Sequence, residues 1–170
     1  MDLFTSIRSA VQGIQLDQNY MKSLAGPAFN IRSSLRAWLT NPSIRAAFWM
    51  RLSSQGGILG VVGRLRLLSG YSCDVSSGAI LQDAVFLPHP IGIVIGKGVR
   101  LLGPVTIYQG ATLGANKRGE YPVLMGNNKV FPNSVVVGGI ELQRGSTVGA
   151  GAFVDYDVAA GQVVRGQHRH

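Results

Sequence analysis

Aliphatic residues recur at every sixth position through the second half of this chain. They form three runs, namely Val75, Leu81 and Leu87; then Ile95, Leu101, Ile107 and Leu113; then Leu124, Val130, Val136, Leu142, Val148 and Val154. Every position is Ile, Leu or Val, although only 46% of the chain is apolar of any kind. A six-residue repeat with one inward aliphatic position is typical of a parallel β-helix, in which three short strands complete one triangular coil. We therefore expect a mainly β protein built from stacked coils, with its strands spaced about 4.8 Å apart.

The chain before residue 72 has a different pattern. Apolar residues there recur at helical spacing, as in Ile31, Leu35, Trp38 and Leu39, and again in Ile44, Phe48, Met50 and Leu52. Asn41-Pro42 is a typical helix start and Gly56-Gly57 a typical stop, which predicts a helix over 43–54. The expected organisation is an N-terminal helical arm over 1–71, a β-helix over 72–164 and a tail over 165–170.

The segment from Ile58 to Leu68 is apolar but contains Arg64 and Arg66. It is too short to cross a bilayer. Two interpretations stay open: the segment packs on the domain, or it makes peripheral contact with an anionic membrane, which would be the inner face of the cell membrane.

Charge and cysteine content narrow the setting. Sixteen Lys and Arg against eight Asp and Glu give a formal charge of +8, which favours an anionic partner such as a nucleotide cofactor, an acidic glycan or a lipid surface. Cys73 is the only cysteine, so no intramolecular disulfide and no cysteine-rich zinc site can form. The first eighteen residues have no continuous apolar core, so they predict neither a signal peptide nor a membrane span. We expect a cytoplasmic protein.

Two breaks in the six-residue repeat mark expected loops. Two extra residues fall around Pro88-His89-Pro90, and five fall within a protruding loop over 114–123. His89 is the only histidine in the repeats, and Asp74 precedes it by fifteen residues, close to one coil of eighteen. A carboxylate on the adjacent coil could orient the imidazole as a general base. The alternative is a loop histidine and a coil-capping aspartate without a chemical role.

Several segments resemble a known family in the same order and with the same Asp-to-His spacing. They are Cys73-Asp74-Val75, His89 followed by Gly92-Ile93-Val94-Ile95-Gly96, the run 105–114 (VTIYQGATLG), and Asp157-Val158-Ala-Ala-Gly161. These residues are similar to the catalytic region of serine O-acetyltransferases, which are hexapeptide-repeat acyltransferases, over about residues 42–164. The resemblance implies a left-handed coil, a homotrimer with sites between adjacent subunits, and acetyl-CoA as acyl donor. It also implies that His89 deprotonates the acceptor hydroxyl and that Asp74 orients His89. The left hand comes from the resemblance alone, because ordinary parallel crossovers are right-handed.

The resemblance extends to an acetyl-CoA site along the outer wall. The matching positions are Ala115, Asn116, Lys117, Pro132, Gly149 and Ala150, with Lys117 and Arg118 placed to meet phosphates. The alternative for the Gly and Ala positions is a tight corner, and the alternative for the two cations is a solvated loop. The sequence has no Walker-type loop, and we expect no metal.

Departures from the family concern the acceptor. Pro88 replaces the family's Asp before the catalytic His, and residues 119–122 read Gly-Glu-Tyr-Pro where the family has Asp-Arg-His-Pro. Glu120 therefore reverses the charge of the arginine that meets the carboxylate of serine. Glu120 and Tyr121 are side chains that suit sugar hydroxyls, so with Pro88 they are the expected acceptor-binding residues. These departures favour a sugar hydroxyl of a surface polysaccharide or its precursor, with serine as the alternative.

Other classes fit less well. A γ-carbonic-anhydrase-like site needs three histidines around one metal, whereas His168 and His170 lie in a short tail that makes a poor ligand set. A purely structural β-helix would leave the Asp-His spacing unexplained. Nucleic-acid binding is not expected, since the sequence has no reader motif.

Overall fold

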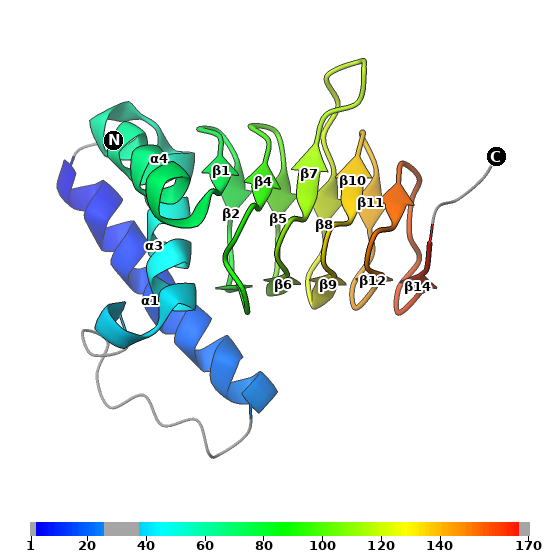
Figure 1. Cartoon of the computed structure of the whole chain (residues 1–170), viewed down its shortest axis with the longest axis horizontal. Coiled ribbons are helices and arrows are strands. Elements are labelled where there is room, and N and C mark those ends of the chain that lie inside the picture. Colours follow the sequence, from blue (N-terminus) through cyan, green and yellow to red (C-terminus); the bar gives the residue numbers. More distant parts are fainter. Residues whose placement is uncertain (1–2, 26–37, 167–170) are drawn as a thin grey trace.

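The computed structural model describes residues 3–25 and 38–166 as a helical region followed by a solenoid of short strands (Figure 1). Helices α1 (Leu3–Ala25), α3 (Pro42–Gln55) and α4 (Gly57–Tyr71) precede the strands. The helices gather at one end of the solenoid, and the strands follow one another along its axis (Figure 1). The expectations that concern Ile31, Leu35, His168 and His170 lie outside the described residues.

Three parallel sheets form the walls of the solenoid. The first wall contains β1 (Asp74–Val75), β4 (Val94–Ile95), β7 (Thr112–Gly114), β10 (Val135–Val137) and β13 (Phe153–Val154). The second contains β2 (Ile80–Leu81), β5 (Arg100–Leu101), β8 (Val123–Leu124) and β11 (Glu141–Leu142). The third contains β3 (Val85–Phe86), β6 (Val105–Ile107), β9 (Asn128–Val130), β12 (Thr147–Val148) and β14 (Val163–Val164). The chain visits the walls in this order, which confirms the predicted parallel β-helix.

Strand register confirms the six-residue repeat and both of its breaks. Ile95 pairs with Val75 across the two-residue insertion, and Leu113 pairs with Ile95 across a regular coil of eighteen residues. Val136 then pairs with Leu113 across the five-residue insertion. All thirteen repeat positions except the half-buried Leu81 are 0% exposed. Full burial of one such side chain contributes about 1.5–3 kcal/mol, so this column of aliphatics is the main stabilising element of the domain.

Helix α3 confirms the predicted start and stop signals. The side chain of Asn41 caps its N-terminus by accepting a hydrogen bond from the Ser43 amide at 2.9 Å. Gly56 ends the helix with a φ of 76°, a left-handed conformation that glycine adopts without steric cost. The helix covers 42–55, compared with the predicted 43–54.

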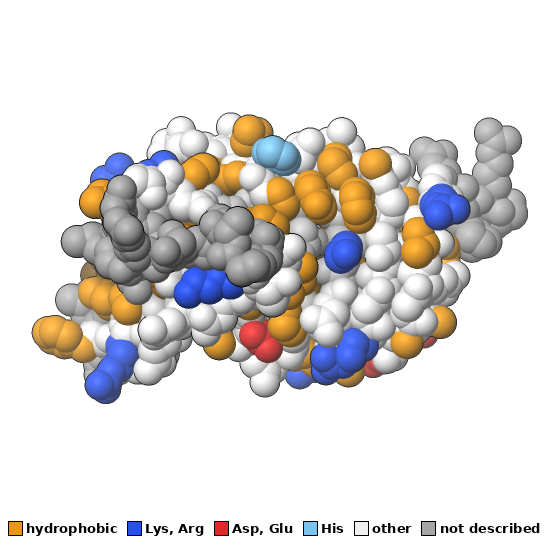
Figure 2. Space-filling view, turned by 90° about the horizontal axis from the view of Figure 1, so that it is seen from below, with side chains coloured by type: hydrophobic (Ala, Val, Ile, Leu, Met, Phe, Trp, Pro, Cys, Tyr) orange, Lys and Arg blue, Asp and Glu red, His pale blue; other side chains and the backbone are white. Residues whose placement is uncertain are grey.

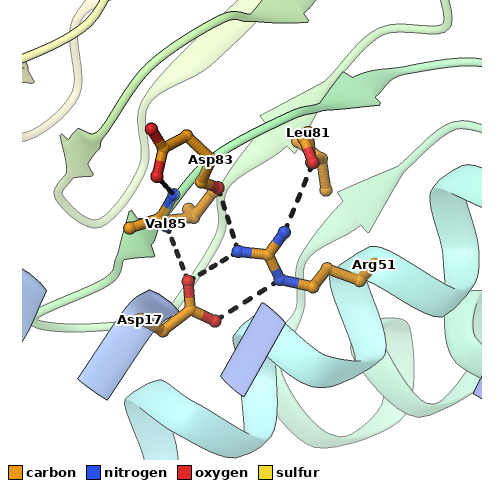
Figure 3. Close-up of polar contacts among 6 residues, drawn as sticks. Asp17, Arg51, Leu81, Asp83 and Val85 are labelled. Atoms are coloured by element: carbon orange, nitrogen blue, oxygen red, sulfur yellow. Dashed lines mark hydrogen bonds and ion pairs between the residues drawn. The ribbon is translucent and has the colours of Figure 1, made fainter. Parts of the chain in front are cut away.

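A buried ion pair joins α1, α3 and the first coil (Figure 3). Arg51 Nη2 lies 2.6 Å from Asp17 Oδ1, and Arg51 also donates to the carbonyl oxygens of Leu81 and Asp83. The amide of Val85 donates to the same carboxylate at 2.8 Å. Burial raises the pKa of Asp17, while the charge and hydrogen bonds of Arg51 oppose that rise. The sequence contains no local pattern that predicts this contact between the arm and the β-helix.

Helix α4 packs through its small side chains. Gly60, Gly63 and Leu67 are buried, and a Cβ at Gly63 would lie 2.8 Å from the carbonyl oxygen of Trp49 on α3. Apart from Leu67, most of the large aliphatics of α4 point outward, with Ile58 84% and Leu65 59% exposed. The segment therefore packs on the domain and also presents an apolar outer face. Within residues 3–25 and 38–166, no helix has both the length and the hydrophobicity needed to cross a membrane.

Candidate active site

His89 lies at the corner between the third wall and the first, on the first coil. The chain turns there between β3 and β4, and the amide of Ile91 donates to the carbonyl oxygen of His89 at 2.8 Å. The Gly92 amide donates to the carbonyl oxygen of Tyr71 at 3.1 Å, which fixes the corner against the end of α4. Pro90 is buried while His89 is exposed. The backbone is therefore anchored and the imidazole is accessible.

A cleft of about 480 Å³ adjoins His89. Its lining comes from three elements: Pro42 and Arg45 of α3, Gly70 and Tyr71 of α4, and the corner residues 88–91. Pro88, an expected acceptor-binding residue, is among them. Because the helical arm forms much of this lining, a small molecule in the cleft would contact the arm and the β-helix together.

Arg45 and Tyr71 are site residues that the sequence alone did not indicate. Arg45 Nε donates to the hydroxyl of Tyr71 at 3.3 Å, and Arg45 Nη1 donates to the carbonyl oxygen of Leu39. These bonds hold a guanidinium beside the corner that carries His89. Nothing in the local sequence marks these two residues, because only the docking of α3 and α4 on the β-helix brings them to His89.

Asp74 contacts Arg64 in this structure. Both carboxylate oxygens accept from the guanidinium, at 2.7 Å and 2.8 Å, and the hydrogen bond and charge of Asp74 raise the pKa of Arg64. Over the described residues, the structure records no hydrogen bond between Asp74 and His89, and Asp74 does not line the cleft. Arg64 reaches Asp74 from α4, whereas His89 lines the cleft together with Tyr71. The Asp74–His89 pair stays a prediction.

The loop between β7 and β8 projects from the solenoid (Figure 1). Asn116 and Glu120 hold it closed, because Asn116 Nδ2 donates to Glu120 Oε2 at 2.7 Å and the Glu120 amide donates back to Asn116 Oδ1 at 3.1 Å. The ring of Tyr121 lies over Gly98, where a Cβ would come within 2.3 Å of it. Glu120 and Tyr121 therefore have structural contacts of their own in addition to any role toward an acceptor.

The remaining cofactor positions divide between two edges of the solenoid. Pro132, Gly149 and Ala150 lie at the corners that stack beyond His89, since Gly151 donates to the carbonyl oxygen of Pro132 at 2.9 Å. Ala115, Asn116 and Lys117 lie in the protruding loop, on the opposite edge of the first wall. Gly149 is also a tight corner, because a Cβ there would lie 2.8 Å from the carbonyl oxygen of Val164.

One chain therefore does not bring all the expected site residues together. His89 lies at the edge where strands of the first wall begin, because it precedes β4. The protruding loop lies at the edge where they end, because it follows β7, so the width of the wall separates the two. About six residues of extended chain span roughly 20 Å.

No group of three or more His, Cys, Asp or Glu side chains suited to a metal occurs among the described residues. The face seen in Figure 2 carries scattered basic side chains and few acidic ones, in keeping with the net charge of +8.

Comparison with known proteins points to one group of enzymes, although no family model matches the chain. The chain is 32% identical over 126 residues to a serine acetyltransferase of Synechococcus elongatus, which covers 72% of this chain and 51% of the relative. It is 32% identical over 99 residues to a putative serine acetyltransferase of Schizosaccharomyces pombe, covering 56% of this chain and 37% of the relative. Over the matched residues, the chain is similar to serine acetyltransferases. It spans about half the length of these curated relatives or less.

Solved structures give the same fold. A truncated serine acetyltransferase apoenzyme matches with a TM-score of 0.80 at 18% identity, over 94% of this chain and 69% of that one. A serine acetyltransferase in complex with CoA matches with a TM-score of 0.79 at 19% identity, over 94% of this chain and 68% of that one. The serine-bound enzyme of Neisseria gonorrhoeae matches with a TM-score of 0.75 at 23% identity, over 95% of this chain and 67% of that one. These matches extend over the helical region as well as the β-helix, so the coil has the hand of those enzymes.

Proposed function

We propose that this protein is an acetyl-CoA-dependent O-acetyltransferase whose general base is His89 and whose acceptor is L-serine. The observation that carries the proposal is the position of His89. It is exposed beside a cleft, in a chain of which 94% matches a CoA-bound serine acetyltransferase. The names of the curated relatives support serine as the acceptor.

The proposed reaction is direct transfer within a ternary complex. His89 takes the proton of the acceptor hydroxyl while the hydroxyl oxygen attacks the thioester carbonyl, so a C–O bond forms and the C–S bond breaks. The proton on His89 then passes to the departing thiolate. Asp74 would hold the imidazole and stabilise its protonated form, provided that its carboxylate turns from Arg64 toward His89.

Chain residues on both edges of the first wall would hold acetyl-CoA. The edge beyond His89 is lined by backbone and by the small residues Pro132, Gly149 and Ala150. An extended thioester arm would fit against this surface. Lys117 is exposed in the protruding loop and would meet phosphates. Because this loop lies across the wall from His89, we propose a homotrimer in which the loop of one chain completes the site at His89 of its neighbour.

Serine replaces the sugar as the favoured acceptor. The sugar hypothesis depended on Glu120 and Tyr121, and both side chains have contacts within their own chain, to Asn116 and to Gly98. The relatives described above are serine acetyltransferases, and the polysaccharide branch has no comparable support. A sugar hydroxyl is therefore the competing arm of the test.

Thiol release from acetyl-CoA tests the proposal. Purified protein receives L-serine in one reaction and a panel of neutral sugars, nucleotide sugars and oligosaccharides in others, with hydrolysis in the absence of acceptor as the blank. Turnover with serine alone supports the proposal, and turnover with sugars alone restores the polysaccharide hypothesis. No turnover with any acceptor, in protein that is folded and trimeric, refutes an O-acetyltransferase of either kind.

Cytoplasmic location and peripheral membrane contact stay predictions. The apolar outer face of α4, which includes Ile58, Val61 and Leu65, is the surface that membrane contact would use. Co-sedimentation with anionic vesicles, compared between the wild type and Leu65→Glu, tests it. Equal recovery of both proteins in the supernatant would refute the contact.

A further inference from the structure

The cleft beside His89 contains a cation with no anionic partner among the described residues. Arg45 is the fourth residue of α3, in a first turn that has no acidic side chain. Across residues 3–25 and 38–166, the recorded ion pairs join Arg51 to Asp17 and Arg64 to Asp74, and no carboxylate pairs with Arg45. The N-terminus of a helix already carries a partial positive charge, which makes this an unfavourable place for an unpaired guanidinium. An anion bound in the cleft would relieve that repulsion.

The hydrogen bonds of Arg45 hold the guanidinium in place without cancelling its charge. Its two recorded acceptors are the hydroxyl of Tyr71 and the carbonyl oxygen of Leu39, and both are neutral. A guanidinium has five N–H donors, so three are left for a ligand. Two parallel donors match the two oxygens of a carboxylate. The Tyr71 hydroxyl accepts from Arg45 and keeps its own proton available for donation.

The protruding loop supplies cations only at Lys117 and Arg118, which the proposed function assigns to the phosphates of acetyl-CoA. Glu120 occupies the loop position at which the resembled family has an arginine, and its carboxylate accepts a hydrogen bond from Asn116. This acidic side chain would repel a carboxylate-bearing acceptor rather than bind it. A chain that acetylates a hydroxy acid therefore needs a different cation near its general base, and among the residues that line the cleft only Arg45 has one.

We propose that Arg45 binds the carboxylate of a small hydroxy acid acceptor and thereby fixes the neighbouring hydroxyl at His89. This inference rests on the proposed function, since it assigns the acceptor specificity of the same site. It makes Arg45 a specificity-determining residue supplied by the helical arm rather than by the β-helix or its loop. The cleft selects a carboxylate beside the hydroxyl, and a neutral acceptor gains nothing from Arg45.

The test compares L-serine with L-serinamide, in which a neutral amide replaces the carboxylate, using wild type, Arg45→Gln and Arg45→Lys. Loss of a charge-assisted pair costs roughly 10- to 100-fold in kcat/KM. We expect this loss for serine in Arg45→Gln, little change for serinamide, and an unchanged KM for acetyl-CoA. Arg45→Lys should fall between, because lysine keeps the charge and loses the paired geometry. The matched control is Arg66→Gln, which removes a guanidinium that stacks on Trp49 outside the cleft.

The outcomes separate this inference from the proposed function. A wild type that acetylates serine, with an unchanged serine-to-serinamide ratio in Arg45→Gln, overturns the role of Arg45 and leaves the function standing. A wild type that acetylates no acceptor removes the function itself. If Arg45→Gln fails to fold, the inference is tested with Arg45→Lys and with the preference of the wild type for serine over serinamide. A wild type with equal kcat/KM for the two acceptors refutes recognition of the carboxylate.

Discussion

Arg64 donates a hydrogen bond to each carboxylate oxygen of Asp74, with Nε 2.7 Å from Oδ1 and Nη2 2.8 Å from Oδ2. The pair links α4 to the first strand of the β-helix, at the aspartate that the sequence resemblance assigns to catalysis. Both side chains are partly exposed, at 50% and 31%, so solvent screens the attraction and its contribution to stability is small. Its effect on activity is the more informative property.

We predict that Arg64 acts on turnover only through Asp74. Arg64→Gln should raise kcat several-fold, because the carboxylate then no longer has to leave the guanidinium before it turns toward His89, and the unfolding midpoint should stay close to that of the wild type. A double-mutant cycle with Asp74→Asn checks the route, since Arg64→Gln should have no further effect in a chain that lacks the carboxylate. An equal change of kcat in both backgrounds would show that Arg64 acts elsewhere, and full activity of Asp74→Asn would remove the aspartate from the mechanism.

His89→Ala should reduce kcat by roughly 10²- to 10⁴-fold, the range for loss of a general base. The affinity for acetyl-CoA should stay close to that of the wild type, because an exposed imidazole at a corner contributes little to the remaining binding surface. Steady-state kinetics and calorimetric titration with CoA measure the two quantities. A mutant with wild-type kcat would exclude His89 as the base, whereas loss of CoA binding would assign it to the donor site.

A shared active site predicts complementation between two inactive chains. One variant carries His89→Ala, and the other lacks residues 116–120 of the protruding loop. Refolded together, they should recover about a quarter of wild-type activity, because random assembly gives that share of sites an intact histidine from one chain and an intact loop from its neighbour. Each variant refolded alone is the control. No recovery, in mixtures shown by light scattering to contain trimers, would place each site within one chain.

The buried pair between Asp17 and Arg51 should dominate attachment of the helical arm. Asp17→Asn leaves Arg51 without its counter-charge and should cost about 3–5 kcal/mol in the free energy of unfolding. Replacing both residues, as in Asp17→Leu with Arg51→Met, should cost less than either single change because no uncompensated charge stays buried. Denaturant unfolding measures all three. A double variant whose loss equals the sum of the single losses would show that the two side chains are not coupled.

Cys73 predicts a pH dependence of stability. Burial raises the pKa of its thiol, although the Ile93 amide, which donates to the sulfur at 3.3 Å, opposes the rise. Above about pH 8.5 the unfolded chain therefore loses the thiol proton before the folded protein does, and the free energy of unfolding falls as pH rises. The stability difference between wild type and Cys73→Ala should narrow between pH 8 and 10, which urea unfolding at several pH values would follow. A difference that widens would contradict the raised pKa.

The β-helix could be predicted in detail because its repeat depends on spacing alone. Strand pairs such as Val75 with Ile95 and Leu113 with Val136 match the predicted positions, insertions included. An inward aliphatic at every sixth residue is a local requirement of the coil, so it is visible without knowledge of distant contacts. The capped start of α3 at Asn41 was predictable for the same reason.

The candidate site was only partly predictable. His89 stands out because it interrupts a regular pattern, but its neighbours Arg45 and Tyr71 come from helices whose docking on the solenoid no spacing rule specifies. The contact of Asp74 with Arg64 was missed for a related reason. The separation along the chain predicted that Asp74 lies on the coil next to His89. It could not predict which charged side chain contacts the carboxylate.

The strand register across the two insertions has a consequence for how such a protein can diversify. Extra residues at a corner leave the column of inward aliphatics aligned, so the length of a loop and the stability of the coil are independent variables. A descendant of this chain could exchange its protruding loop for a longer or shorter one without repacking its interior. Acceptor choice can therefore evolve by insertion and deletion at the corners, while the interior changes only by conservative substitution.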